Sequence, residues 1–145
     1  MASGDIVVTV TAVGSDTRGT AVNFAPTAKT FTSIADVYYR PGLITSTTVQ
    51  TLLTVGGTAG GNNIVTLNCL IIINLDSTET VILGFIDTGV KSAYLQLGPG
   101  ETFVYMADQL ETDDDTGAVF SAFTGIDTIT VDAVANTPRI SVLAF

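Results

Sequence analysis

The chain has 145 residues, of which 46% are hydrophobic, which suits one domain with a buried core and excludes a disordered chain. Acidic residues outnumber basic ones by 14 to 5, histidine is absent, and the formal net charge is −9. Because nucleic acids and anionic membranes are bound through clustered Lys and Arg, this balance argues against direct contact with either partner.

Apolar and polar residues alternate with a period of two along the whole chain, the pattern of half-buried β-strands. The predicted strands, in chain order, span residues 5–13, 20–24, 27–40, 48–55, 63–74, 79–86, 91–97, 101–107, 117–123, 127–135 and 138–145. Turn sequences rich in Gly, Pro, Asp and Ser separate them. We therefore predict an all-β fold in a single domain spanning 1–145, namely an antiparallel, jelly-roll-like β-sandwich of about ten short strands. Helix is limited to a turn or two around 106–115.

Three segments carry more specific expectations. The end of 63–74 is apolar on both faces, which predicts a strand in the middle of a sheet. The last six residues, "ISVLAF", predict a final strand, paired either within the chain or with another subunit. Cys69, a lone cysteine among Leu and Ile, is expected to be an inert buried thiol. The start "MASGDIVV" shows no secretory signal and no apolar run is long enough to span a membrane, so we expect a protein made in a cytoplasm and soluble there.

Candidate catalytic groups are sparse. Without histidine, the usual base of Ser and Cys nucleophiles is missing. Lys91 and Ser92 point to opposite faces of a predicted strand, which disfavours a Ser–Lys dyad. Glu79 and Glu101 are possible glycosidase carboxylates. Both lie in turn-like positions that are ordinary for a solvated charge, so we predict that the protein is not an enzyme and has no cofactor.

Two loops resemble ligand sites in part. Glu111, Asp113 and Asp115 repeat the first three ligand positions of a calcium-binding EF-hand loop, but Thr116 replaces the required Gly and Ala122 the required Glu. A solvated acidic loop is therefore favoured, and no metal is predicted. The run "GGTAGG" at 56–61 lacks the Gly-Lys-Ser/Thr of a phosphate-binding P-loop, which favours a loop tip between two strands.

Tyr38, Tyr39 and Arg40 form the candidate interface. They are consecutive in a predicted strand, so one tyrosine ring should face the core and the other should point outward. Tyr and Arg are enriched at binding hot spots, and an outward Tyr beside Arg40 is a candidate anchor. A half-buried tyrosine at a strand edge is the alternative. Only 13% of residues are charged, which indicates surface buried against copies of the chain or against a partner. A monomeric, Thr-rich β protein is the alternative.

One third of the chain resembles a known family. The segment "NCLIIINLDSTETVILGFIDTGVKSAYLQLGPGETFVYMA" has Asn74 before a Ser/Thr-rich turn, "VILGF" at 81–85, "LQLGPGE" at 95–101 and the aromatic strand "TFVYM" at 102–106. In this order the pieces resemble small β-sandwich structural proteins of tailed bacteriophages. Within the last two pieces, Pro99 and Gly100 predict a type II turn, with Glu101 as a solvated charge at the corner.

The resemblance implies a virion component without catalytic groups. The first reading is a capsid decoration (cement) protein that binds the outside of a phage head as a trimer and stabilises it, with the major capsid protein or another virion protein as partner. A neck, tail or adaptor component is the alternative within this class. A carbohydrate-binding β-sandwich that uses Tyr38, Tyr39 and the acidic loop is an alternative of another class.

Overall fold

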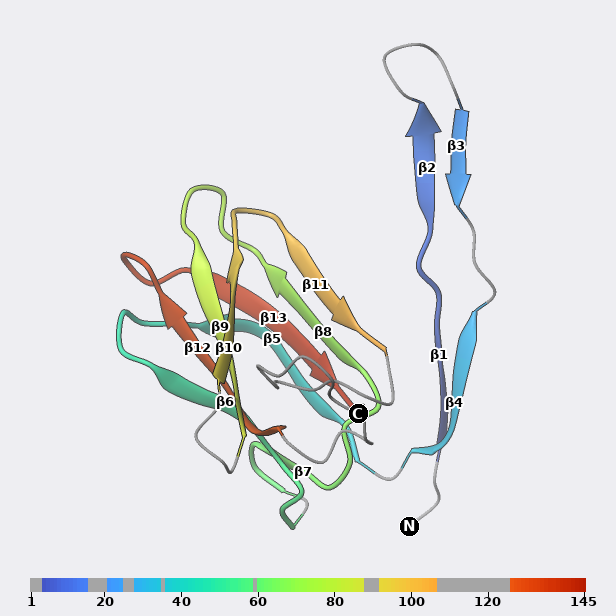
Figure 1. Cartoon of the computed structure of the whole chain (residues 1–145), viewed down its shortest axis with the longest axis horizontal. Helices are drawn as coiled ribbons and strands as arrows, with labels where there is room; N and C mark the ends of the chain where they lie inside the picture. The colour runs from blue at the N-terminus through green and yellow to red at the C-terminus, as the bar shows by residue number, and fades with distance from the viewer. Residues whose placement is uncertain are drawn as a thin grey trace, which may run out of the picture. The chain divides into compact units, whose positions relative to one another are not determined.

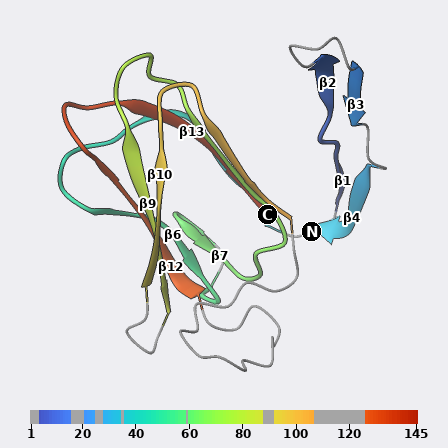
Figure 2. The same cartoon turned by 45° about the horizontal axis from the view of Figure 1, so that its top comes forward.

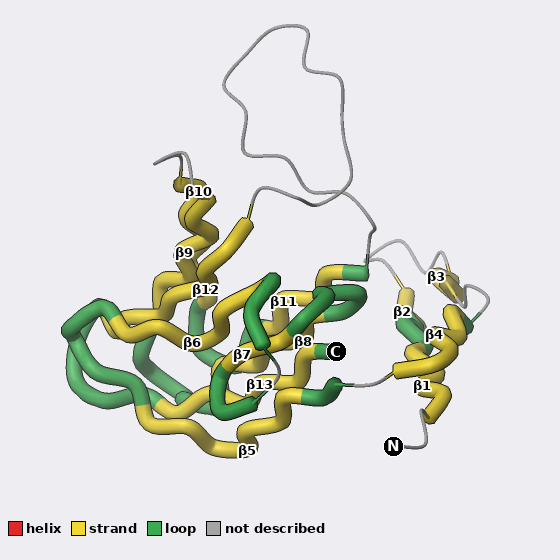
Figure 3. Tube along the Cα trace, turned by 90° about the horizontal axis from the view of Figure 1, so that it is seen from below, coloured by secondary structure: helices red, strands yellow, loops and turns green. Residues whose placement is uncertain are grey.

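The computed structural model describes residues 4–15, 21–24, 28–34, 36–58, 60–87, 92–106 and 126–145. These residues form thirteen strands and no helix (Figure 3), which confirms the all-β prediction. In the same ranges, no helical stretch has the length and apolar character needed to cross a bilayer. The possible helical turns after Met106 and the strand predicted at 117–123 lie outside the described residues.

The chain divides into two compact units, Met1–Ala35 and Asp36–Phe145, and each is described by itself. The expectation of one domain over 1–145 stays a prediction, whereas the strands of the sandwich all belong to the second unit. In the first unit, two antiparallel pairs form, β1 with β4 and β2 with β3 (Figure 1). Their bounds are Gly4–Val8 for β1, Ala12–Ser15 for β2, Ala21–Phe24 for β3 and Lys29–Ile34 for β4.

The predicted strand 27–40 is two strands in the structure. β4 ends at Ile34, and β5 begins at Tyr38 in the second unit. Near the end of β4, Ser33 has a φ of 59°, a left-handed conformation that interrupts an extended strand. The Ser33 N–H donates to Oδ1 of Asp5 on β1 at 3.2 Å. The sequence from Phe31 to Tyr39 contains no Gly or Pro, so no turn signal marks the break.

The second unit contains two sheets that form two layers (Figures 1 and 2). Their orders are β11-β8-β13-β5 and β10-β9-β12-β6-β7, and every pair is antiparallel except β6 with β7. The bounds are Tyr38–Ile44 (β5), Gln50–Val55 (β6), Asn63–Ile64 (β7), Leu70–Asn74 (β8), Val81–Asp87 (β9), Ser92–Leu97 (β10), Thr102–Tyr105 (β11), Ile126–Ala133 (β12) and Arg139–Ala144 (β13). Without the two-residue β7, strands that are neighbours in sequence mostly alternate between sheets, as in two interlocked Greek keys, the topology of a jelly roll.

The core lies between the two sheets and is made by alternate residues of the strands. Fully buried side chains from both layers include Leu52, Leu53, Leu70, Ile72, Val81, Leu83, Ile129, Val131, Ile140 and Val142. Cys69 is buried as expected. β8 lies between β11 and β13, with two isoleucines on its outer face that are half-buried, so the prediction of an interior strand is confirmed. The alternation along each strand thus decides which side chains enter the core and which lie on the outer face of the sheet.

The C-terminal segment is an inner strand of this chain. β13 pairs with β8 on one side and β5 on the other, which decides between the two pairings left open by the sequence. Phe145 is 1% exposed. Its N–H donates to the carbonyl of Cys69 at 3.1 Å, and its carbonyl accepts from the N–H groups of Asn68 and Cys69 at 2.7 and 2.9 Å. Backbone pairing and burial together hold this end of the strand in place.

Candidate functional site

The predicted interface residues occupy both faces of β5. Tyr38 is buried in the core at 8% exposure, whereas Tyr39 is 60% exposed, so the prediction of one inward and one outward ring is confirmed. Arg40 is exposed, and its guanidinium carbon lies 5.4 Å from the centroid of the Tyr38 ring, a cation–π contact. Their role in an interface stays a prediction, for which Tyr39 and Arg40 offer the exposed groups.

An apolar row crosses the outer face of the sheet that contains β5. Strand register places Val104 beside Ile71, Ile71 beside Leu143, and Leu143 beside Tyr39. Val104 is 38% exposed, and Ile71 and Leu143 are half-buried. The four strands of this sheet contain no Asp or Glu and carry two arginines. We call these four residues the apolar face.

Asn74 holds one end of the sandwich together. Its side chain is fully buried, and Nδ2 donates to the carbonyls of Glu79, Leu97 and Gly98 at 2.7, 3.1 and 3.0 Å. Its Oδ1 accepts from the N–H of Asp76 at 3.0 Å. A buried amide is costly unless it is hydrogen-bonded, and here one side chain satisfies groups from three segments. Asn74 therefore fixes the ends of β8, β9 and β10 relative to one another.

The Gly-Pro-Gly-Glu turn closes the same corner. Gly100 has a φ of 71°, and the Glu101 N–H donates to the carbonyl of Gly98 at 3.1 Å, as expected for a type II turn. The Glu101 carboxylate accepts from the Gly98 N–H at 2.6 Å through Oε2. The turn residues thus set the entry to β11, and the carboxylate serves as an acceptor in the turn.

The other carboxylates of this corner also accept hydrogen bonds. Oδ1 of Asp76 accepts from the backbone N–H of Thr78 at 2.9 Å, from its hydroxyl at 3.1 Å, and from the N–H of Glu79 at 3.0 Å. These donors, the Thr78 N–H first, hold the pKa of Asp76 below its ordinary value of 3.8. Oε1 of Glu79 accepts from Nδ2 of Asn136 at 2.6 Å. The corner is therefore a scaffold of satisfied polar groups.

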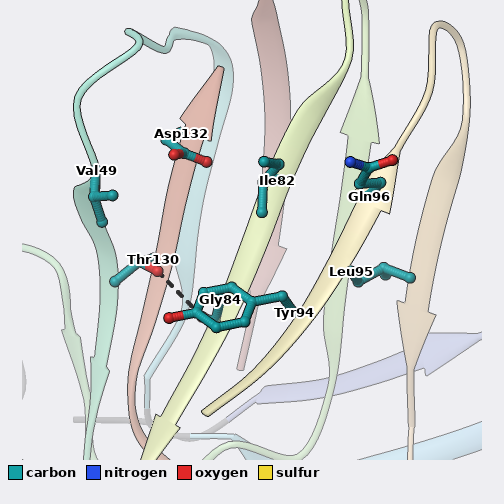
Figure 4. Close-up of a pocket in the computed structure, with 8 residues that line it drawn as sticks. All are labelled: Val49, Ile82, Gly84, Tyr94, Leu95, Gln96, Thr130 and Asp132. Atoms are coloured by element: carbon teal, nitrogen blue, oxygen red, sulfur yellow. Dashed lines mark hydrogen bonds between the residues drawn. The ribbon is translucent and has the colours of Figure 1, made fainter. Parts of the chain in front are cut away.

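A hollow of about 280 Å³ lies on the outer face of the other sheet (Figure 4). Register places Gly84 of β9 between Tyr94 of β10 and Thr130 of β12. A Cβ atom at position 84 would lie 3.1 Å from Cε1 of Tyr94 and closer still to Oγ1 of Thr130. The Tyr94 ring extends across Gly84 toward Thr130 and remains 69% exposed. Glycine at this position makes room for the ring to lie on the sheet.

A second row of side chains completes this hollow. Ile82 of β9 is paired with Gln96 of β10 and Asp132 of β12, two residues along from the first row. Ile82 and Asp132 are half-buried and Gln96 is exposed, while Val49 closes the side toward β6. The Tyr94 hollow therefore combines an exposed aromatic ring, an apolar floor, a carboxylate, an amide and a hydroxyl. Among the described residues that line it, none is basic.

The sequence also offered Lys91, the acidic loop and the glycine-rich loop as candidate sites, and the structure describes only some of these residues. Lys91 and the acidic loop with Glu111, Asp113 and Asp115 lie outside the described residues. Within the described ranges no cluster of three or more potential metal-ligating side chains occurs. In the glycine-rich loop, Gly56, Gly60 and Gly61 have positive φ angles, and the loop connects β6 to the short β7, as expected for a loop tip.

Sequence reasoning did not find the Tyr94 hollow. Period-two patterns show which residues of one strand share a face, but they do not show which strands are neighbours. Two signals were present, namely Gly84 inside an apolar strand and Tyr94 in an alternating strand. A glycine within a strand often marks close approach of another group, and here that group is the tyrosine ring.

Comparisons of the chain with protein-family models, curated proteins and solved structures find no match in any of the three.

Proposed function

We propose that this protein is a virion structural protein, a capsid decoration (cement) protein of a tailed bacteriophage. In this proposal it assembles as a trimer on the outside of the head, contacts the major capsid protein and stabilises the shell. The resemblance of residues 68–107 supports the class of protein. The observation that carries the proposal is the apolar face, which lies on four strands without an acidic residue and is suited to contact with other protein copies.

The exposure of the apolar face supports an interface. Tyr39 and Val104 lie at its two ends, on the edge strands β5 and β11, and are 60% and 38% exposed. Complete burial of a large apolar side chain stabilises by about 1.5–3 kcal/mol. Burial of these residues between copies holds the trimer together. The trimer then presents three shell-binding surfaces that raise the effective concentration of one another, so that weak contacts add up to firm attachment.

The charge distribution indicates which surface tolerates another copy. Each chain carries a formal net charge of −9, so copies repel one another. The sheet with the apolar face carries only Arg40 and Arg139 as charged residues, whereas the other sheet carries Asp87, Asp127 and Asp132. Contact through the sheet with the apolar face avoids bringing like charges together, which favours this sheet as the surface that binds other protein copies.

The test measures oligomeric state and shell binding together. Mass photometry and light scattering at micromolar concentration should give a mass three times the 15.0 kDa of one chain. Val104→Glu places a charge at the edge of the apolar face and should yield a folded monomer that pellets with phage heads at least tenfold more weakly. Val65→Glu changes a 52% exposed valine outside this sheet and should remain trimeric.

A wild-type chain that stays monomeric and does not pellet with heads contradicts the proposal. A larger closed ring favours the neck, tail or adaptor alternative, because those positions have a different symmetry. Dissociation of both variants to the same extent shows that the apolar face is not the contact surface.

A further inference from the structure

We infer that the Tyr94 hollow is a binding site for a neutral sugar ring, in addition to the structural role proposed above. The hollow lies on the sheet opposite to the apolar face, so both surfaces can act in one copy. The inference rests on the two in-register rows of side chains and on the exposed ring that lies across Gly84 (Figure 4).

The aromatic ring supplies the apolar half of the site. One side of the Tyr94 ring approaches Gly84, at 3.1 and 3.4 Å from the position of an absent Cβ, while 69% of the residue stays accessible. The face of an aromatic ring carries negative partial charge, which attracts the weakly positive C–H groups on one side of a sugar ring. Because Gly84 fixes where the ring lies, this platform is formed before a ligand arrives.

The polar groups around the platform match hydroxyl groups. The Asp132 carboxylate accepts hydrogen bonds, and the Gln96 amide both donates and accepts. Thr130 is 7% exposed, and its hydroxyl donates to the carbonyl of Gly84 at 3.5 Å. Sugar hydroxyls can meet the Asp132 and Gln96 side chains while the ring carbons cover Tyr94 and Ile82. An anion is disfavoured, because the hollow contains the Asp132 carboxylate and the chain has a net charge of −9.

The size of the hollow limits the ligand to about one ring. A volume of about 280 Å³ is at the lower end of small-molecule sites. Because the site is a depression on a sheet face, it does not enclose its ligand. For a ligand of this size we expect a Kd on the order of 1 mM. Binding in a trimer, or on a decorated particle, is then strengthened by multivalency.

The experiment titrates the ¹⁵N-labelled 145-residue chain with methyl glycosides of glucose, galactose, mannose and N-acetylglucosamine. Binding is followed by amide chemical shifts. At least one glycoside should produce saturable shifts centred on Gly84, Tyr94 and Gln96. Tyr94→Ala should weaken this binding tenfold or more, and Tyr94→Phe should retain most of it, because the ring is kept. Val65→Ala serves as a control at an exposed valine outside the site and should bind as the wild type does.

A cationic ligand is the competing occupant, because a tyrosine face next to a carboxylate also attracts a basic side chain. Methylguanidine is therefore titrated in parallel, with Asp132→Asn as the distinguishing variant. A neutral sugar should lose only about threefold on this change, since the amide oxygen still accepts a hydrogen bond. The inference is overturned if no glycoside of the panel shifts these amides at 20 mM. It is also overturned if methylguanidine binds more tightly than every glycoside and loses its binding in Asp132→Asn.

Discussion

Removal of the Asn74 side chain should destabilise the sandwich more than any exposed substitution at the same corner. Its Nδ2 has two protons, which serve three carbonyls, and its Oδ1 accepts one further N–H. Counting three hydrogen bonds at about 1 kcal/mol each, Asn74→Ala should lower the free energy of unfolding by about 3 kcal/mol. For a chain of this length that corresponds to a fall in Tm of about 10 °C.

Urea unfolding followed by circular dichroism provides the measurement. Asn136→Gly is the matched control, because it removes an amide that binds Glu79 at an exposed position whose φ of 55° suits glycine. The control should change the free energy of unfolding by less than about 0.5 kcal/mol. A loss below about 1 kcal/mol for Asn74→Ala with an unchanged m-value, or an equal loss in the control, refutes the reasoning.

Asn74→Asp separates the hydrogen bonds from the shape of the side chain. A carboxylate at this position faces three carbonyl oxygens and has no proton to donate, whereas its protonated form can donate one. The pKa of this carboxyl should therefore be raised in the folded state above the unfolded value of about 3.9. The stability of the variant should be greatest below that value and fall as the pH rises, which urea midpoints between pH 3 and 7 will show. A pH dependence that runs the other way contradicts the network.

Three further predictions concern the same unit. The pKa of Asp76 is lowered in the folded state, so its contribution to stability is present above pH 3.8 and is lost as the pH falls through the lower folded pKa. The urea midpoints of the wild type and of Asp76→Asn should therefore differ at pH 7 and converge in acid. Phe145→Ala should cost about 4 kcal/mol in urea unfolding, because the ring is fully buried; a cost below about 1 kcal/mol contradicts this packing. Gly100→Ala should cost about 1 kcal/mol from its positive φ alone, since open space surrounds the added Cβ; an unchanged urea midpoint contradicts the turn assignment.

Local patterns predicted most of the strands and the direction of their side chains, although they joined β4 and β5 into one strand. Alternation placed one tyrosine of the Tyr38–Tyr39 pair inward and one outward, because successive side chains of a strand point to opposite faces whatever the sheet order. The Gly-Pro-Gly-Glu turn was equally readable, since the φ preferences of Pro99 and Gly100 act within four residues. Both are short-range effects.

The sites depended on contacts that no local pattern contains. Gly84 meets Thr130 across 46 residues of sequence, and the hollow exists only because β9 lies between β10 and β12. The apolar face likewise needs β8 and β13 to be neighbours, with Tyr39 and Val104 added on the edge strands. Sheet order is decided by long-range backbone pairing and by closure of the core, and many orders satisfy the same alternation. The sequence alone therefore determined the class of fold and which side chains of a strand point to the same face. The tertiary structure decided which side chains of different strands come into contact.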